Sequence, residues 1–364
     1  MNILLALMGL DIGGAETHVV TLAKALKNKG YNVVVVSSGG VYEASLKASN
    51  IAHVYAPLAE KSPKAIVKSV VAMRRAVKTY HVDIIHTHGR IPSLIGGVVA
   101  TLTKSKFMTT VHAMYKLNSY KWLSLFGKET ICISDDIRQH VIRNYNVEKE
   151  KITVIPNCID TNLFVPGEES GSTFTVGYVS RMEGELADRA IEVAEMLTDY
   201  AYREHSEIKL LIVGDGLDFN RVVSQVNQIS KRIADQDQAK MIEILLLGKR
   251  TDIPDLMHQM DVVVCVSRVA LEAMSCGKPV ILLGGEGYEG LLTKESYAHA
   301  KGSNFTGRTS TMVFEGVGFI EQIDSLRKSP DYRRKLGEWG RARIEESYSI
   351  DQIVDETIKI YKSL

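Results

Sequence analysis

The sequence predicts an α/β protein of two domains, each built on a doubly wound parallel sheet with helices on its faces. Three observations support this fold class. The chain has 364 residues, more than the roughly 250–300 residues at which a single hydrophobic core usually stops growing. Short apolar segments alternate with amphipathic ones, as in right-handed βαβ units. The alternation stops at a polar stretch, 166–172, and then begins again.

In the first half of the chain, short apolar segments rich in valine and isoleucine are expected to form the strands. They lie at 3–7, 32–37, 52–55, 83–86, 107–111, 130–133 and 152–155. Continuous apolar runs of this kind are typical of strands buried on both faces of a parallel sheet. Amphipathic helices are expected between them. In the first helix, Ala15, Val19, Leu22 and Leu26 share one face.

The second half repeats the pattern and ends in one more helix. Strands are expected at 174–179, 209–213, 242–247, 261–264 and 279–282. The final helix is opened by Ser349, and Gln352 three residues later would complete a capping box. We therefore predict domains at 1–165 and 166–345, followed by a C-terminal helix at 346–364 whose apolar face packs on one of them.

Composition excludes several classes of protein. The apolar opening, 1–8, is too short to span a bilayer and lacks a basic n-region, so a buried strand is expected there. The four cysteines are scattered and show no CxxC spacing, which favours reduced thiols in a cytoplasmic protein. No HExxH or paired-cysteine pattern occurs, so no metal site is predicted.

The charge is distributed unevenly along the chain. Residues 1–163 hold 20 Lys and Arg against 11 Asp and Glu, whereas residues 164–364 hold 24 against 32, within a net charge of only +1. Either the first domain meets an anionic ligand, or the surface charge simply differs between the domains. No nucleic-acid partner is predicted.

Parallel α/β sheets bind ligands at the carboxyl ends of their strands, and several polar residues are expected there. Gly13 and Gly14 follow the first strand and open a helix, whose N-terminal N–H groups would suit a phosphate. A structural tight turn is the alternative. The spacing is not GxGxxG and no acidic residue ends the second strand, so a dinucleotide site is disfavoured.

Two charged residues of the second domain are the main candidates for donor chemistry. Arg181 follows the first strand of that domain, where a guanidinium would hold a diphosphate through two parallel hydrogen bonds, unless it is a solvated surface arginine. Glu272 lies in a small, apolar helix between Arg268 and Gly277. A carboxylate there needs donors, which ribose hydroxyls, a cap or a salt bridge would supply.

Histidines gather near the predicted strand ends of the first domain. His18, His86 and His88 are candidates for contact with a ligand at these strand ends. His88 and Arg90 together are a candidate acceptor-binding pair. Satisfied structural histidines are the alternative for each.

The stretch 61–80 combines six basic residues with an apolar face. Such a helix would suit the surface of an anionic membrane, although a solvated basic face over a buried apolar one is the simpler explanation of the pattern.

Eight segments occur in a specific order along the chain. They read GGAETHVVTLAKALKNKGYNVVVVS, TVHAM, ICISDDIRQHV, VIPNCIDTNLF, GYVSRM, LLIVGDG, LLLGKRTDIPDLMHQMDVVV and ALEAMSCGKPVI. In these segments the chain resembles the retaining glycosyltransferases of family 4 (glycosyl transferases group 1), over nearly its whole length. The resemblance implies the GT-B fold, in which two Rossmann-like domains flank an interdomain cleft. The first domain binds the acceptor, the second binds the nucleotide sugar, and the last helix returns to the first domain.

The resemblance also implies roles for individual residues. The backbone at Gly13 and Gly14 would face the donor phosphates, and His112 in TVHAM would lie beside the transferred sugar. Arg181 would bind the diphosphate and Glu272 the ribose. The loop that reads the base would begin with Gly248, Lys249 and Arg250.

Two departures from the family pattern stand in the second domain. Leu186 occupies the place of a lysine, and Val264 occupies the place of a second glutamate. Ser267 and Arg268, near a helix N-terminus, are expected to hold the phosphates instead. The glycine-rich loop expected at 284–290 would present Glu289 or backbone N–H groups to the sugar.

The function implied is retaining, metal-independent transfer of a sugar, most simply from a UDP-sugar, to a sugar, lipid or small-molecule acceptor in cell-envelope or glycan biosynthesis. No cofactor is expected beyond the donor itself. The protein would work in the cytoplasm, with the inner face of the membrane as an alternative site. A nucleotide-sugar epimerase or hydrolase, and a non-catalytic nucleotide-sugar-binding homologue, remain alternatives.

Overall fold

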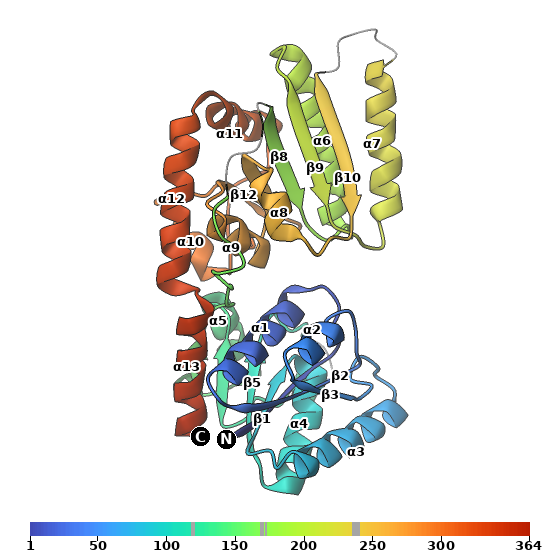
Figure 1. Ribbon diagram of the computed structural model, residues 1–364, viewed down its shortest axis with the longest axis vertical. Coiled ribbons are helices and arrows are strands. Elements are labelled where there is room, and N and C mark those ends of the chain that lie inside the picture. The colour runs from blue at the N-terminus through green and yellow to red at the C-terminus, as the bar shows by residue number, and fades with distance from the viewer. Residues whose placement is uncertain (118–120, 168–170, 172, 235–240) are drawn as a thin grey trace. The chain divides into compact units, whose positions relative to one another are not determined.

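The computed structural model describes residues 1–117, 121–167, 171, 173–234 and 241–364 (Figure 1). They form two compact units: Met1–Asp160 with Ser347–Leu364, and Thr161–Glu346. The C-terminal segment therefore belongs to the first unit. Of the predicted linker, residues 168–170 and 172 lie outside the described part.

The first unit is built on a parallel sheet with the strand order β3-β2-β1-β4-β5-β6-β7. The strands are β1 (Asn2–Leu7), β2 (Asn32–Ser37), β3 (Ala52–Tyr55), β4 (Ile84–His88), β5 (Lys106–Val111), β6 (Glu129–Cys132) and β7 (Ile152–Val154). Because every described pair in this sheet is parallel, all the strands end at one edge. The loops at that edge can therefore share a ligand.

Helices cover both faces of the first sheet. They are α1 (Gly14–Asn28), α2 (Glu43–Ala48), α3 (Pro63–Thr79), α4 (Arg90–Thr103), α5 (Asp135–Tyr145) and α13 (Ile350–Ser363), with 3-10 turns at Lys121–Leu123 and Lys149–Lys151. Successive β1 residues point to opposite faces: Ile3 and Leu5 pack in the core formed with α1 and α13, whereas Leu4 and Ala6 pack in the core formed with α3 and α4.

The end of the chain is part of the core of the first unit. Ile350, Ile353, Val354 and Tyr361 of α13 are buried with α1 and β1. Ser349 is the N-cap residue of α13, but its side chain makes no capping hydrogen bond. The capping-box prediction is therefore wrong, and the helix is held by its buried face instead.

The second unit contains a mixed sheet with the order β10-β9-β8-β11-β12-β13. The strands are β8 (Phe174–Val179), β9 (Ile208–Val213), β10 (Ile242–Gly248), β11 (Val262–Cys265), β12 (Val280–Leu283) and β13 (Tyr288–Leu291). The first five are parallel, and β13 runs antiparallel at the edge beside β12. The expected loop at 284–290 is thus wrong in its second half, which forms a hairpin strand.

Helices also surround the second sheet. They are α6 (Glu185–Arg203), α7 (Phe219–Ala234), α8 (Ile253–His258), α9 (Arg268–Ser275), α10 (Tyr297–Gly302), α11 (Gly316–Lys328) and α12 (Pro330–Ser347). Val176 and Tyr178 of β8 pack in one core with α6, α7 and α11. The short α9 contacts β11 and β12.

The basic helix expected at 61–80 is α3, and part of its apolar face is exposed. Val67 and Val71 each keep 63% of their surface in solvent, although Val77 is buried. Among the described helices, none combines the length and the hydropathy that crossing a membrane requires.

Candidate active site

The carboxyl edge of the first sheet begins with the N-terminus of α1. Gly13 is the N-cap residue and Gly14 is the first helical residue, as the sequence predicts. Gly14 is exposed. The helix therefore presents N–H groups to solvent at the edge where the strands end, which is a favourable position for an anion.

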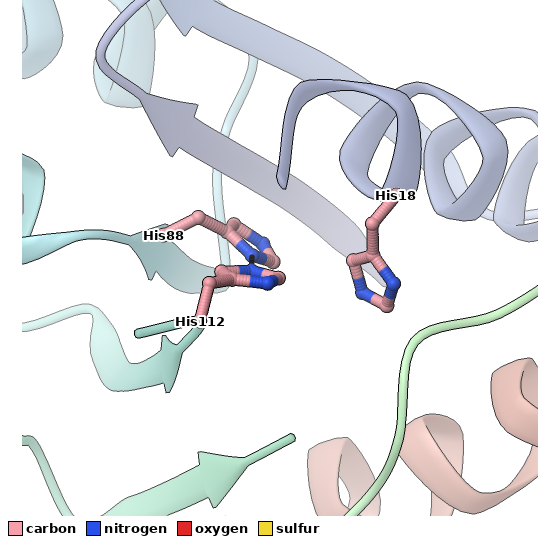
Figure 2. Close-up of side chains that lie close together, drawn as sticks. All are labelled: His18, His88 and His112. Carbon is pink, nitrogen blue, oxygen red and sulfur yellow. Dashed lines mark hydrogen bonds between the residues drawn. The ribbon is translucent and has the colours of Figure 1, made fainter. Parts of the chain in front are cut away.

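Three histidines lie together at this edge and are called the histidine cluster below: His18, His88 and His112. Figure 2 shows His88 and His112 side by side at the ends of neighbouring strands, with His18 facing them from a helix. His88 ends β4, His112 directly follows β5, and His18 lies in α1. The rings of His18 and His112 meet edge to face, with centroids 5.1 Å apart.

The histidine cluster is held by hydrogen bonds of its ring nitrogens. Nδ1 of His88 and Nε2 of His112 lie 2.9 Å apart, so one of them donates to the other. Nδ1 of His18 accepts from the backbone N–H of Cys158 at 3.3 Å. Burial, reinforced by the neighbouring imidazoles, holds the pKa of His88 well below its usual range. His88 is therefore neutral at physiological pH.

One ring nitrogen of His88 is buried without a hydrogen bond to any described residue. The residue is only 3% exposed, and its Nε2 atom has no hydrogen-bond partner among the described residues. Burying a polar atom without a hydrogen bond costs free energy. A ligand placed against the histidine cluster would supply the missing hydrogen bond.

His86 is a structural residue and does not belong to the cluster. Its Nδ1 and Nε2 atoms lie 2.7 Å from the hydroxyls of Tyr361 and Thr110, respectively. Burial lowers the pKa of His86 to about 3. The structural alternative holds for His86, because Thr110 of the neighbouring strand β5 and Tyr361 of α13 use both of its ring nitrogens.

Arg90 anchors the loop that follows β5. Its guanidinium lies over the rings of Tyr115 and Tyr145, 5.0 and 5.7 Å from their centroids, and donates to the carbonyl of Lys116 at 3.0 Å. These contacts support the loop that begins at His112. Acceptor binding by Arg90 and His88 stays a prediction.

The strand-end loops of the second unit are packed tightly against each other. The loop after β9 presses on the loop after β8: a Cβ on Gly214 would lie 1.8 Å from the carbonyl oxygen of Ser180, and one on Gly216 would lie 2.4 Å from that of Met182. On the other side of β8, a Cβ on Gly285 would lie 3.2 Å from the Cβ of Glu185. Only glycine allows the approaches at Gly214 and Gly216, whereas a side chain at Gly285 would need Glu185 to shift by a few tenths of an ångström. The LLIVGDG segment therefore allows the two loops to pack closely.

Arg181 lies in the loop that this packing supports. Its side chain is 60% exposed, and its ion pair with Glu183 spans 3.8 Å. A surface pair of this kind contributes little to stability. The guanidinium is therefore available to an anionic ligand at the carboxyl edge of this sheet.

Glu272 and Arg268 form a buried ion pair within α9. Nε of Arg268 lies 2.8 Å from Oε1 of Glu272, and the two side chains are 7% and 10% exposed. Burial raises the pKa of Glu272, against the opposing effect of Arg268. The salt-bridge alternative for Glu272 is thus realised, while ribose binding by Glu272 and phosphate binding by Arg268 remain predictions.

Ser267 is hydrogen-bonded to residues 304 and 305, a segment that the sequence does not predict to lie beside it. Its backbone has a φ of 56°. Its hydroxyl accepts from Nδ2 of Asn304 at 2.7 Å, and its N–H donates to the carbonyl of Phe305 at 2.8 Å. These residues are far apart along the chain, so no motif spacing indicates the contact.

Glu289 is a buried carboxylate on β13. Its Oε1 atom lies 2.6 Å from Nδ1 of the half-exposed His299, and its Oε2 atom has no hydrogen-bond partner among the described residues. The spare oxygen has the chemistry to bind a hydroxyl, as predicted for a sugar ligand.

The segment predicted to read the base follows β10. Gly248 has a φ of 60°, and Lys249 and Arg250 are exposed. Nε of Arg250 donates to Oδ1 of Asp252 at 2.8 Å, and this contact lowers the pKa of Asp252. Base recognition by these residues is untested.

The two departures from the family pattern lie in regular secondary structure. Val264 is a fully buried residue of β11, which confirms the strand prediction. Leu186 is part-buried in the first turn of α6, where its carbonyl accepts from the Tyr178 hydroxyl at 2.6 Å.

Two Rossmann-like units of this kind form the fold of the GT-B glycosyltransferases, and the family assignment comes from comparison with known proteins. The model of Glycosyltransferase Family 4 matches residues 12–163, and that of Glycosyl transferases group 1 matches residues 173–301. The chain therefore belongs to the family 4 glycosyltransferases.

Individual relatives are distant. The chain is 28% identical over 267 residues to the UDP-Gal:alpha-D-GlcNAc-diphosphoundecaprenol alpha-1,3-galactosyltransferase of Escherichia coli, covering 63% of this chain and 65% of that enzyme. It is 24% identical to the N-acetyl-alpha-D-glucosaminyl L-malate synthase of Bacillus anthracis, over 96% of this chain and 94% of that one. Anabaena Alr3699/HepE, solved in complex with UDP and glucose, matches with a TM-score of 0.74 and 19% identity over the whole of both chains.

Proposed function

We propose that this glycosyltransferase moves a sugar from a UDP-sugar to its acceptor with retention of anomeric configuration and without a catalytic metal. The acceptor is a sugar, a lipid or a small molecule of glycan or cell-envelope synthesis. The support for a UDP-sugar is the E. coli relative, named for UDP-Gal, and the solved fold relative that binds UDP and glucose.

The single observation that carries the proposal is the exposed guanidinium of Arg181 at the carboxyl edge of the second sheet. Departure of a nucleoside diphosphate develops negative charge, and preorganised positive groups stabilise that charge in the transition state. Arg181 would bind the two phosphates through parallel, charge-assisted hydrogen bonds, which removes the need for a bridging metal ion.

The histidine cluster supports a separate role in sugar binding. His88, directly hydrogen-bonded to His112, is buried and neutral, and neutral imidazoles bind hydroxyls without repelling or ionising them. His112 would position the transferred sugar by hydrogen bonding, while the leaving phosphate oxygen accepts the proton of the attacking hydroxyl. The new glycosidic bond then forms on the face from which the diphosphate departs.

The surface of α3 supports work at the cytoplasmic face of an anionic membrane. Its exposed side presents Val67 and Val71 among exposed basic residues, namely Lys64, Lys68, Arg74, Arg75 and Lys78. A helix with apolar and basic groups on one exposed side binds anionic lipid surfaces. A membrane-embedded acceptor would then lie within reach of the first unit.

A ligand screen tests the donor. Each of a set of UDP-, ADP- and GDP-sugars is added to the full chain, and the thermal unfolding midpoint is measured. A donor at 100 times its dissociation constant adds about 2.7 kcal/mol to the stability of the native state, so a UDP-sugar is expected to raise the midpoint above the other nucleotides. Equal or absent shifts throughout the set would contradict the proposal.

A further inference from the structure

The histidine cluster brings three nitrogen ligands to one point. One ring nitrogen from each of His18, His88 and His112 lies within 4.8 Å of the other two. His18 and His88 are buried and His112 is half-buried. All three members of the cluster are imidazoles, and none is an acid.

The spacing of these nitrogens is close to that of a metal site. A tetrahedral Zn²⁺ ion with bonds of about 2.0–2.1 Å holds its ligand nitrogens about 3.3 Å apart. The distance of 2.9 Å between Nδ1 of His88 and Nε2 of His112 is slightly shorter, and the 4.8 Å bound on the three nitrogens is longer. Binding an ion therefore requires the rings to rotate until the three nitrogens lie about 3.3 Å apart.

The proton balance also allows an ion to bind. In the hydrogen bond between His88 and His112, one of the two facing nitrogens carries the proton. An ion between them requires this proton to move to the other nitrogen of the same ring by exchange with solvent, so no net proton is released. If His88 is the donor, its Nε2 atom receives the proton; this atom makes no hydrogen bond among the described residues.

We propose that His18, His88 and His112 form a binding site for Zn²⁺ or a similar imidazole-preferring ion, and that the bound ion blocks sugar transfer. Three imidazoles without a carboxylate favour Zn²⁺, Co²⁺, Ni²⁺ or Cu²⁺ over Mg²⁺ and Ca²⁺, which prefer oxygen ligands. Three protein ligands leave the fourth position of Zn²⁺ open to water or a ligand oxygen. The blocking effect rests on the proposed function, because an ion held by His112 would prevent this side chain from positioning the sugar.

Sequence motifs could not show this site. Known zinc patterns place two ligands a few residues apart, whereas here α1, β4 and the loop after β5 each contribute one histidine. Only the parallel pairing of β4 with β5, which sets His88 opposite Thr110, brings the ends of these strands together.

The test is direct metal binding to the full chain. Protein treated with a chelator is dialysed against ZnCl₂, and bound zinc is measured; Co²⁺ serves as a second probe through its visible absorption. We expect one ion per chain in the wild type. Even outer-shell partners typically account for 10- to 100-fold in affinity, so His112→Gln and His88→Gln should each lower the affinity by about 100-fold or more.

The matched control is His205→Asn, which changes an exposed histidine with a φ of 46° that asparagine tolerates. It should bind zinc like the wild type. Circular dichroism verifies that each variant is folded, and the half-buried His112 is the safer of the two test positions. Wild-type binding by both cluster variants, or no tight site in the wild type, would overturn the metal site whether or not the protein transfers sugar. Zinc binding at the cluster without inhibition of transfer would overturn the blocking effect alone.

Discussion

The strand-end residues of the two units differ in their electrostatics. In the first unit they are imidazoles, His88 and His112, which bond to each other at 2.9 Å. In the second unit they are charged: an exposed Arg181 and the buried pair of Arg268 and Glu272. The two edges have the same architecture, but they are suited to different parts of a substrate.

Under the proposed function, the difference would correspond to the two chemical parts of a nucleotide sugar. Hydroxyl groups need donors and acceptors without net charge, whereas a leaving diphosphate needs fixed positive charge. A buried charge must also be balanced, which explains why the second unit pairs Arg268 and leaves Arg181 in solvent. The following experiments test this division, from the largest expected effect to the smallest.

The largest effect is expected from breaking the buried pair in α9. Glu272→Leu leaves the buried Arg268 without its carboxylate partner, and such changes typically cost about 3–5 kcal/mol. The free energy of unfolding in urea measures it. Glu338→Leu is the matched control, because Arg334 and Glu338 have the same spacing and a 2.7 Å contact but are exposed, so about 0–1 kcal/mol is expected. Equal losses in the two variants would show that the burial of the pair is unimportant.

Arg181→Ala should reduce turnover by about 10²–10³, or roughly 2.7–4 kcal/mol, as expected for loss of a preorganised group that stabilises developing charge. The free energy of unfolding of the Arg181→Ala variant should hardly change, because the ion pair that it loses is exposed. Arg232→Ala is the control, since Arg232 is 54% exposed and pairs with Asp199 at 3.9 Å, much as Arg181 pairs with Glu183. Steady-state kinetics on both variants decide the matter, and turnover by Arg181→Ala at the wild-type rate would exclude its role.

Acid should destabilise the first unit through His86. Its pKa is about 3 in the folded protein and about 6.5 in the unfolded chain. Between these two pH values the unfolded state binds a proton that the folded state does not bind. The contribution of neutral His86 to the free energy of unfolding is present above pH 6.5 and is lost as the pH decreases toward 3. The loss is about 2 kcal/mol at pH 5.

His86→Gln tests this pH dependence through urea unfolding at pH 7 and pH 5. The variant should lose about 2 kcal/mol less than the wild type over that interval, because glutamine does not titrate. The exposed His205→Asn variant should behave like the wild type. Identical losses in the wild type and His86→Gln would show that His86 is not the group responsible.

The smallest effect concerns α3. Replacing Val67 and Val71 by serine should weaken binding to anionic vesicles by about fivefold, or about 1 kcal/mol, since two partly inserted apolar groups are lost. Leu102→Ser, at an exposed position of α4, is the control. Vesicle flotation at low and high salt measures the change. A wild-type protein that does not float at low salt would refute membrane association.

Much of the fold could be predicted because buried parallel strands have a simple signature. The strands at 32–37, 52–55 and 174–179 have the predicted bounds. By contrast, β13 was missed because its glycine at position 290 and the glycines before it favour a loop. It forms through tertiary pairing with β12, which local propensity does not report.

The candidate site was predictable only where a family motif fixes both residue type and position. Motifs assign Arg181, Glu272 and His112 to the site, and these roles stay predictions; motifs could not show that Glu272 has an internal partner in Arg268. They also did not identify His18 as a neighbour of His112. Contacts between distant elements depend on sheet order, and a single sequence does not contain that information.

The most direct test of the account is the anomeric configuration of the product. The full chain is incubated with α-linked UDP-sugars and a set of sugar and lipid acceptors, and each product is analysed by mass and by NMR. We predict an α-linked product that forms only when an acceptor is present. A β-linked product would contradict retention, and conversion of the donor without any acceptor would contradict sugar transfer itself.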